Sequence, residues 1–186
     1  MIDVWSRRIV GSAVHERESG DHAAALLQSI CAETGVDSAG LVLHSDNGKP
    51  MRGSTMLAML QWLGIVPSFS RPHVSNDNPY SESLFRTLKQ TPAYPSLPFA
   101  STGTARAWVS RFVAWYNMEH RHSGIRYVTP DQRHRGEDQR LLTRRAELYE
   151  AARRRRPDRW TRSTRDWAPV LTVTLNPSPQ QPANAA

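Results

Sequence analysis

The sequence predicts an α/β protein in which short apolar strands alternate with amphipathic helices. Two observations support this prediction. Short apolar runs at residues 41–43 and 65–69 lie between turn residues, as buried strands do. Longer segments, such as residues 23–31, repeat apolar side chains at the spacing of one helix face. The alternation of these two patterns indicates the α/β class.

The first predicted element is an antiparallel hairpin of residues 2–5 and 8–14, linked by the polar pair Ser6-Arg7. Gly35 and Gly64 are expected to end two of the helices that follow. The remaining predicted elements, in chain order, are a helix over 23–31, a strand over 41–43, a helix over 55–63, a strand over 65–69, helices over 79–88, 102–118 and 138–156, and a strand over 170–175.

The apolar periodicity also predicts which side chains face the core. On the helix over 79–88, Leu84, Phe85 and Leu88 are expected to point inward. On the helix over 138–156, the inward set includes Leu148 and Tyr149. The aromatic residues of the helix over 102–118 are interpreted as core packing rather than as a cofactor site.

Composition limits the class of protein. The chain has 186 residues, and its apolar fraction of 39% is sufficient for a packed core. No apolar run approaches the roughly 18–20 residues of a spanning helix, so we expect no membrane insertion. A single cysteine, Cys31, allows no internal disulfide, which fits a reducing cytoplasm.

The positive charge is concentrated in the last third of the chain. Residues 1–120 are neutral overall, whereas residues 121–186 carry the whole net charge of +7. Of the 24 basic residues all but Lys49 and Lys89 are arginine, whose guanidinium binds phosphate in a bidentate manner. The pattern favours nucleic acid as a partner, and a solvated basic surface is the alternative.

Two acidic residues lie at positions where a carboxylate is unfavourable unless it has a chemical role. Asp46 follows the strand over 41–43, and Glu82 lies on a helix with apolar neighbours. Two carboxylates about 4 Å apart would repel by roughly 4 kcal/mol at an effective dielectric of 20. A divalent cation removes this repulsion, and oxygen ligands favour Mg²⁺ or Mn²⁺. Surface acids are common, so the spacing alone also fits two unrelated side chains.

Two motifs extend this interpretation. The first is His44-Ser45-Asp46-Asn47-Gly48, and the second is the segment SNDNPYSESLFRTLK over residues 75–89. Further matches are Trp115-Tyr116-Asn117, His120-Arg121-His122-Ser123, Thr129-Pro130 and Arg159-Trp160. Together they resemble the catalytic core of orfB-type insertion-sequence transposases, a branch of the retroviral-integrase superfamily, and the resemblance covers nearly the whole chain.

The resemblance implies a ribonuclease-H-like mixed sheet flanked by helices. Two ions, Mg²⁺ or Mn²⁺, would be held there by two Asp and one Glu for cleavage and strand transfer of DNA. Asp46 matches the second Asp of the family and Glu82 its Glu. We expect an integrase-type core over residues 1–130 and an Arg-rich helical extension with a flexible tail over 131–186.

The predicted DNA contacts lie on two helices. Lys89 matches a family position that approaches transposon-end DNA, and Arg86 would either do the same or pair with Glu82. Asn78 is expected to cap the helix that carries Glu82. The basic run expected at the DNA consists of Arg153, Arg154, Arg155 and Arg156.

The resemblance places the first family Asp on a core strand before Met1, so we expect a core that lacks this strand and is truncated at its N-terminus. Asp3 matches a different family Asp and is expected to be structural. With two carboxylates the chain is expected to be nearly inactive in strand transfer. The alternative is a non-catalytic transposase remnant that binds DNA through its basic tail.

The histidines are secondary candidates. His120, His122 and His134 lack ordinary zinc spacing, so contact with DNA or support of the bend after residue 118 is expected instead. His44 would orient a ligand, touch substrate or pack under the strand end. The expected partners are transposon-end and target DNA, further copies of the chain and an upstream DNA-binding subunit, in a bacterial cytoplasm and on the nucleoid when bound to DNA.

Overall fold

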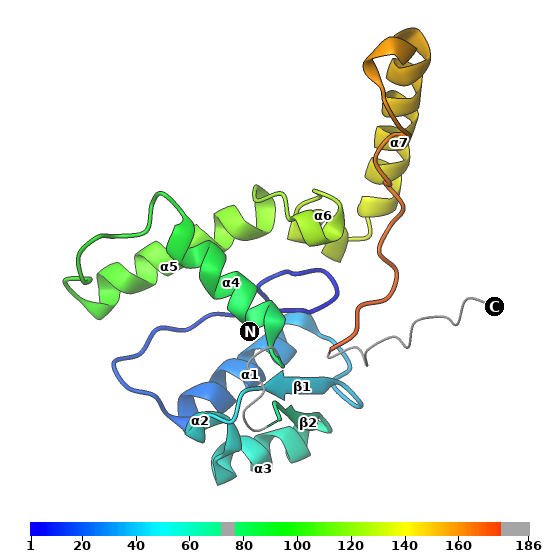
Figure 1. The fold of residues 1–186 in the computed structure, drawn as a ribbon. Helices are drawn as coiled ribbons and strands as arrows, with labels where there is room; N and C mark the ends of the chain where they lie inside the picture. The colour runs from blue at the N-terminus through cyan, green and yellow to red at the C-terminus, as the bar shows by residue number, and fades with distance from the viewer. Residues whose placement is uncertain (72–76, 176–186) are drawn as a thin grey trace. The chain divides into compact units, whose positions relative to one another are not determined.

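The computed structural model describes residues 1–71 and 77–175 of the chain. The chain divides into two compact units, which are described separately here (Figure 1). The first unit consists of Met1–Ile9 and Arg111–Val173, and the second consists of Val10–Ser110 with the chain from Thr174 onward.

The second unit contains a parallel two-stranded sheet. Strand β1 (Val42–Ser45) pairs with β2 (Val66–Phe69), with Val42 opposite Val66 and Ser45 opposite Phe69. The crossover between the strands is made by α2 (Lys49–Arg52) and α3 (Ser54–Leu63), as parallel pairing requires (Figure 1). The alternation of strand and helix predicted from the sequence is confirmed here.

Glycines end the two helices that support this sheet. Helix α1 (Gly20–Thr34) ends at Gly35 with φ 60°, and α3 ends at Gly64 with φ 70°. Both are left-handed conformations in which a Cβ is unfavourable, so the predicted helix ends are confirmed. Helices α1 and α3 pack on each other and bury the apolar side chains Ala24, Leu27, Met56 and Leu60.

Helix α4 (Pro79–Gln90) starts with proline in its first turn, where the missing N–H is not needed. None of its residues is fully buried. Leu84 and Leu88 are half-buried, but Phe85 is 58% exposed, so its predicted inward orientation is wrong. The helix buries the face that carries Leu84 and Leu88, and Phe85 is rotated by about 100° from Leu84.

Helix α5 (Thr102–Met118) crosses from the second unit into the first. In the second unit, the Trp108 indole N–H donates to the Ala93 carbonyl at 2.8 Å, and the ring packs against Tyr94 and Phe99. In the first unit, α5 buries Phe112 and Tyr116. The interpretation of these aromatic residues as packing groups is confirmed.

The first unit is built on α6 (Pro130–His134) and α7 (Asp138–Arg155), with 3₁₀ turns η1 (Ser123–Ile125) and η2 (Pro157–Arg159). Its apolar core consists of Ile125, Val128, Leu142 and Trp167. Leu148 on α7 is 57% exposed, which corrects its predicted inward orientation. Tyr149 is 42% exposed, but its ring packs against the core residue Trp167, with ring centroids 5.1 Å apart.

The predicted hairpin is reduced to one antiparallel bridge between Ile2 and Ile9. Beyond Ile9, a side chain replaces the next strand. The Asn117 amide accepts from the Ile9 N–H and donates to the Ile9 carbonyl, both at 2.9 Å. The strands predicted to continue over residues 10–14 and to form over residues 170–175 are absent.

Candidate active site

Asp46 follows β1 at the carboxyl end of the parallel pair. Its carboxylate Oδ1 accepts a hydrogen bond from the Gly48 N–H at 3.1 Å, and the residue is exposed. The Asn47 amide donates to the Ser70 carbonyl at 2.7 Å and so fixes the turn onto the segment that follows β2. Asp46 therefore projects from an anchored turn at the edge where α/β proteins place their sites.

His44 connects this strand end to the start of α4. Its Nδ1 lies 2.9 Å from the Ser68 hydroxyl, and its Nε2 lies 3.0 Å from the Asp77 carbonyl. Of the roles considered for His44, the structure shows it as a bridge between β1, β2 and the residue before the α4 N-cap. The first turn of α4, with Glu82, is thereby attached near the end of β1.

Asp77 is the buried anchor of the same junction, only 1% exposed. Its carboxylate accepts two hydrogen bonds from the Arg71 guanidinium, at 2.7 and 2.9 Å, and one from the Arg71 backbone N–H at 2.6 Å. The hydrogen bonds from Arg71 lower the pKa of Asp77 to about 2. The segment around Asp77 carried no sequence signal that separated this aspartate from the polar residues beside it.

Glu82 lies in the first turn of α4 and is exposed. Asn78 occupies the N-cap position as predicted, but its side chain makes no capping hydrogen bond. Among the ion pairs between described residues, none joins Arg86 to Glu82. No cluster of three or more potential metal ligands occurs within residues 1–71 and 77–175. The convergence of Asp46 and Glu82 on one cation stays a prediction.

The amino-acid sequence of this chain matches that of known proteins. Two family models, each described as an integrase core domain, match residues 1–75 and 63–130. The transposase for insertion sequence element IS904 of Lactococcus lactis subsp. lactis (strain IL1403) is 28% identical over 130 residues, which are 69% of this chain and 51% of that protein. The chain belongs to the integrase core domain family. It spans about half the length of this curated relative.

Solved structures of integrases confirm the predicted ribonuclease-H-like α/β class. The catalytic core domain of BIV integrase is 20% identical, with a TM-score of 0.51 over 73% of this chain and 85% of that one. A chain of the simian T-cell lymphotropic virus intasome in complex with PP2A regulatory subunit B56 gamma is 18% identical, with a TM-score of 0.50 over 63% of this chain and 41% of that one. At these identities the likeness concerns the fold.

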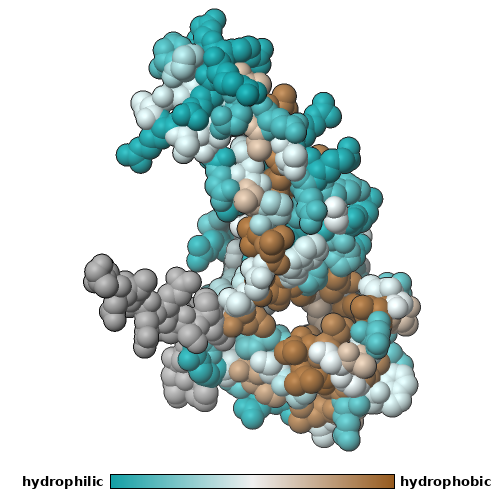
Figure 2. Space-filling view, turned by 90° about the vertical axis from the view of Figure 1, so that its right-hand side faces the viewer, coloured by the Kyte–Doolittle hydropathy of each residue, from teal (hydrophilic) through white to brown (hydrophobic). Residues whose placement is uncertain are grey.

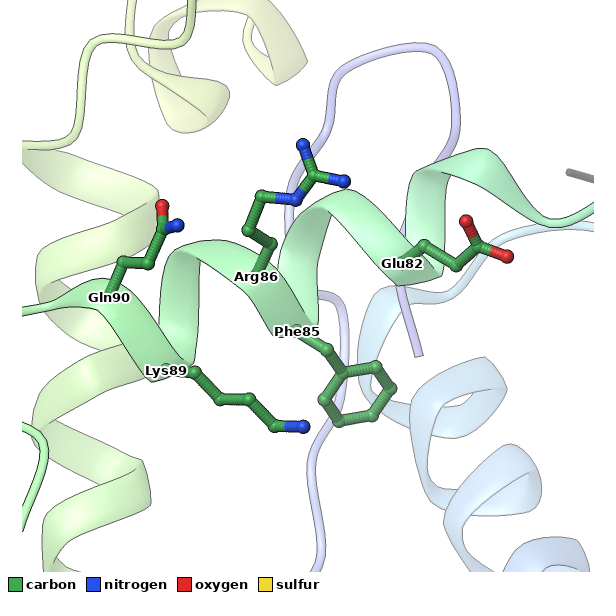
Figure 3. A pocket seen from close by; sticks show the side chains of 5 residues that line it. All are labelled: Glu82, Phe85, Arg86, Lys89 and Gln90. Carbon is green, nitrogen blue, oxygen red and sulfur yellow. The ribbon is translucent and has the colours of Figure 1, made fainter.

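In this integrase core, the side chains of α4 surround a surface hollow of ≈ 500 Å³ (Figure 3). The lining residues are Glu82, Phe85, Arg86, Lys89 and Gln90. The hollow thus contains the predicted metal ligand Glu82 and both predicted DNA contacts of this helix, Arg86 and Lys89. Sequence reasoning missed Phe85 as a member, because its apolar side chain was assigned to the core.

The predicted basic run lies at the end of α7 in the first unit, beyond the residues 1–130 that the integrase core models match. Arg153, Arg154 and Arg155 are in its last turn and Arg156 is its C-cap, and all four are exposed. Arg153 has a Glu150 carboxylate 3.7 Å away. Figure 2 shows mainly hydrophilic side chains over the outer part of this helix. These arginines are accessible to a large anionic ligand.

Asp3 has local partners in the first unit. Its carboxylate accepts hydrogen bonds from the Ser6 hydroxyl at 2.5 Å and the Trp5 N–H at 3.1 Å, and His134 Nδ1 lies 3.3 Å away. Burial alone would raise the pKa of Asp3, but the hydrogen bonds from Ser6 and Trp5 outweigh it and lower the pKa. Asp3 therefore stabilises the turn over residues 3–6.

His120 and His122 pack near the end of α5. His120 stacks on Tyr116, with ring centroids 5.3 Å apart. His122 is the N-cap of η1 and accepts from the Gly124 N–H at 3.1 Å. Burial lowers the pKa of His122 to about 4, so it is neutral at pH 7. These contacts support the bend after α5, one of the two roles expected for these residues.

No helix in the described part of the chain combines the length and hydrophobicity needed to cross a bilayer.

Proposed function

We propose that this integrase core carries part of the DNA-processing site of a bacterial insertion-sequence transposase, with Asp46 and Glu82 as ligands of a divalent cation. The observation that supports the proposal is the His44 bridge, which links the end of β1 to Asp77, the residue before the N-cap of the Glu82 helix. Both carboxylates belong to the second unit and are exposed.

The donor set suits Mg²⁺ or Mn²⁺. Both candidate ligands offer hard carboxylate oxygens, and Asp46 uses only Oδ1 in its bond to Gly48. Magnesium commonly binds through one or two carboxylates and completes its shell with water and substrate phosphate oxygens. When bound, the cation would activate a water or a DNA 3′-hydroxyl for attack on a phosphodiester. Two protein ligands and a phosphate are therefore a chemically consistent set.

The proposed substrate is the DNA of the transposon ends and of the target. Arg86 and Lys89 would contact phosphates next to Glu82, and the exposed arginines at the end of α7 would bind the duplex elsewhere. Catalysis would take place in a multimer of this chain, with a DNA-binding subunit or domain as a partner. The setting would be the bacterial cytoplasm, with the nucleoid as the site of action.

Catalysis by this chain alone is expected to be weak. The two-ion chemistry of the resembled family uses three carboxylates, of which Asp46 and Glu82 match two. We therefore expect cation and DNA binding by the purified chain, with little strand transfer. The second candidate function, DNA binding without catalysis, is favoured by the exposed arginines of α7 and requires no cation.

Mn²⁺ binding separates the two candidates. The chain is mixed with a duplex that carries the inverted repeat flanking its gene, and bound Mn²⁺ is counted by electron paramagnetic resonance. Asp46→Asn and Glu82→Gln should each weaken Mn²⁺ binding at least tenfold. The double variant should lose little more than either single variant, because the two carboxylates share one ion.

The matched controls are Asp37→Asn and Glu33→Gln, which remove exposed acids of the same unit. They should leave Mn²⁺ binding unchanged. Equal losses in the control variants would show non-specific binding and refute the shared site. DNA binding without any Mn²⁺ dependence would favour the non-catalytic alternative.

A further inference from the structure

Phe85 is a large apolar side chain held in an otherwise charged surface. It is 58% exposed on α4, whereas Leu84 and Leu88 provide the packing face of this helix. Its neighbours around the hollow are the carboxylate of Glu82 and the cations of Arg86 and Lys89. Exposure of an aromatic ring to water is unfavourable, so a ligand that covers the ring gains its burial free energy.

The arrangement of the side chains separates the aromatic ring from one of the two cations. Figure 3 shows Phe85 and Lys89 on one side of α4, with the Lys89 side chain extended toward the ring, and Arg86 and Gln90 on the other side. Glu82 is three residues before Phe85 and four before Arg86, so it is a neighbour of both on the helix surface. A ligand on the ring therefore lies next to Lys89 and Glu82.

An aromatic ring with a cation beside it is a combination that binds an unpaired nucleotide. The base stacks on the ring, and the phosphates on either side contact the cations. A base inside a duplex has both faces covered by its neighbours, and a base in a terminal pair is still held by its partner strand. An unpaired base has neither constraint and can lie flat on the Phe85 ring. Charge complementarity fits a polyanion, because the hollow carries two cations and one carboxylate.

We infer that Phe85 is a positioning residue that stacks on an unpaired nucleotide at the end of the transposon DNA. The stacked base would hold the strand with one phosphate at Lys89 and the next at the divalent cation proposed at Glu82. The inference rests on the proposed function for the choice of DNA as the ligand. It adds a preference for frayed or overhanging ends over blunt ones.

Fluorescence anisotropy with the full chain tests this preference. The probes are one duplex with a two-nucleotide 3′ overhang and the same duplex with a blunt end. Phe85→Ala should weaken binding of the overhang duplex by about 5-fold to 150-fold, the range given by alanine substitution of a stacking aromatic. Binding of the blunt duplex should change less than twofold, because phosphate contacts remain.

Two further variants separate stacking from general packing. Phe85→Trp keeps an aromatic face and should retain the overhang preference, whereas Phe85→Leu keeps apolar volume and should lose it. Trp62→Leu removes a 70% exposed aromatic of α3 and should have no effect. A 2-aminopurine in the overhang should be quenched by wild type and not by Phe85→Leu.

Several results would overturn the inference. Equal binding of both duplexes by wild type would do so, and so would a full overhang preference in Phe85→Leu. Sedimentation that shifts toward monomer in Phe85→Ala, with unchanged DNA binding, would assign Phe85 to a contact between copies instead. Mn²⁺ binding is measured separately. The proposed cation site can therefore be refuted while the overhang preference is observed, and the overhang preference can be refuted while Mn²⁺ binding is observed.

Discussion

Replacement of Asn117 by alanine is expected to destabilise the first unit by about 2–6 kcal/mol. The Asn117 amide bonds both backbone groups of Ile9 at 2.9 Å, and Ile9 is 7% exposed. A buried polar group without a partner costs about 1–3 kcal/mol, and the alanine variant leaves two of them. Entry of a water into the vacated space would hold the cost near the lower end.

Urea denaturation measures this change as a shift in midpoint at constant slope. Hydrogen exchange at the Ile9 amide reports the loss of its hydrogen bond to Asn117 separately from the change in global stability. Asn117→Asp keeps an acceptor for the Ile9 N–H, so this amide should stay protected while the carbonyl loses its donor. Met118→Ala, at a 61% exposed neighbour, should change stability by less than about 0.5 kcal/mol. An alanine variant with wild-type stability and exchange would refute the reasoning.

Two further predictions concern the second unit. Because Arg71 holds the pKa of Asp77 near 2, the stabilisation by Asp77 is complete above about pH 4 and is lost as pH falls toward about 2. Asp77→Asn and Arg71→Gln should therefore lower the urea midpoint at pH 7. Between pH 4 and 2 the midpoint of each variant should decrease less with falling pH than that of wild type, and an equal decrease would contradict this. Gly35→Ala should cost about 1 kcal/mol through its positive φ alone. Gly64→Ala should cost more in thermal unfolding, because its Cβ would lie 3.4 Å from the Ala39 Cα.

The fold class and most helices followed from local patterns. Helix periodicity together with capping residues predicted α1, α3, α4, α5 and α7, because these signals lie within a few residues of one another. Helix α6 was missed, although Thr129 and Gln132 form a capping box in the structure. With five residues, this helix is too short to show an apolar period.

The errors arose where a distant residue decides the local structure. The strand predicted over residues 8–14 is reduced to a single bridge at Ile9, whose backbone N–H and carbonyl bond Asn117, 108 positions away. Phe85 has the apolar character of a core residue, and only the packing of Leu84 and Leu88 determines that its side of α4 stays exposed. The contact with Asn117 leaves no trace in the sequence around Ile9.

In the motif around Asp46, the neighbouring side chains hold the backbone in place and leave Asp46 as the candidate cation ligand. His44 bridges Ser68 and Asp77, and Asn47 donates to the Ser70 carbonyl, so the polar groups of these two side chains form structural hydrogen bonds. Only the Asp46 carboxylate is left with an oxygen free for a cation, since its other oxygen bonds Gly48. A substitution at His44 should therefore displace the start of α4, and Glu82 with it, while Asp46 keeps its own turn. The bridging residues are as necessary to the candidate site as its two carboxylates, because a cation shared by two elements requires both to be held at one place.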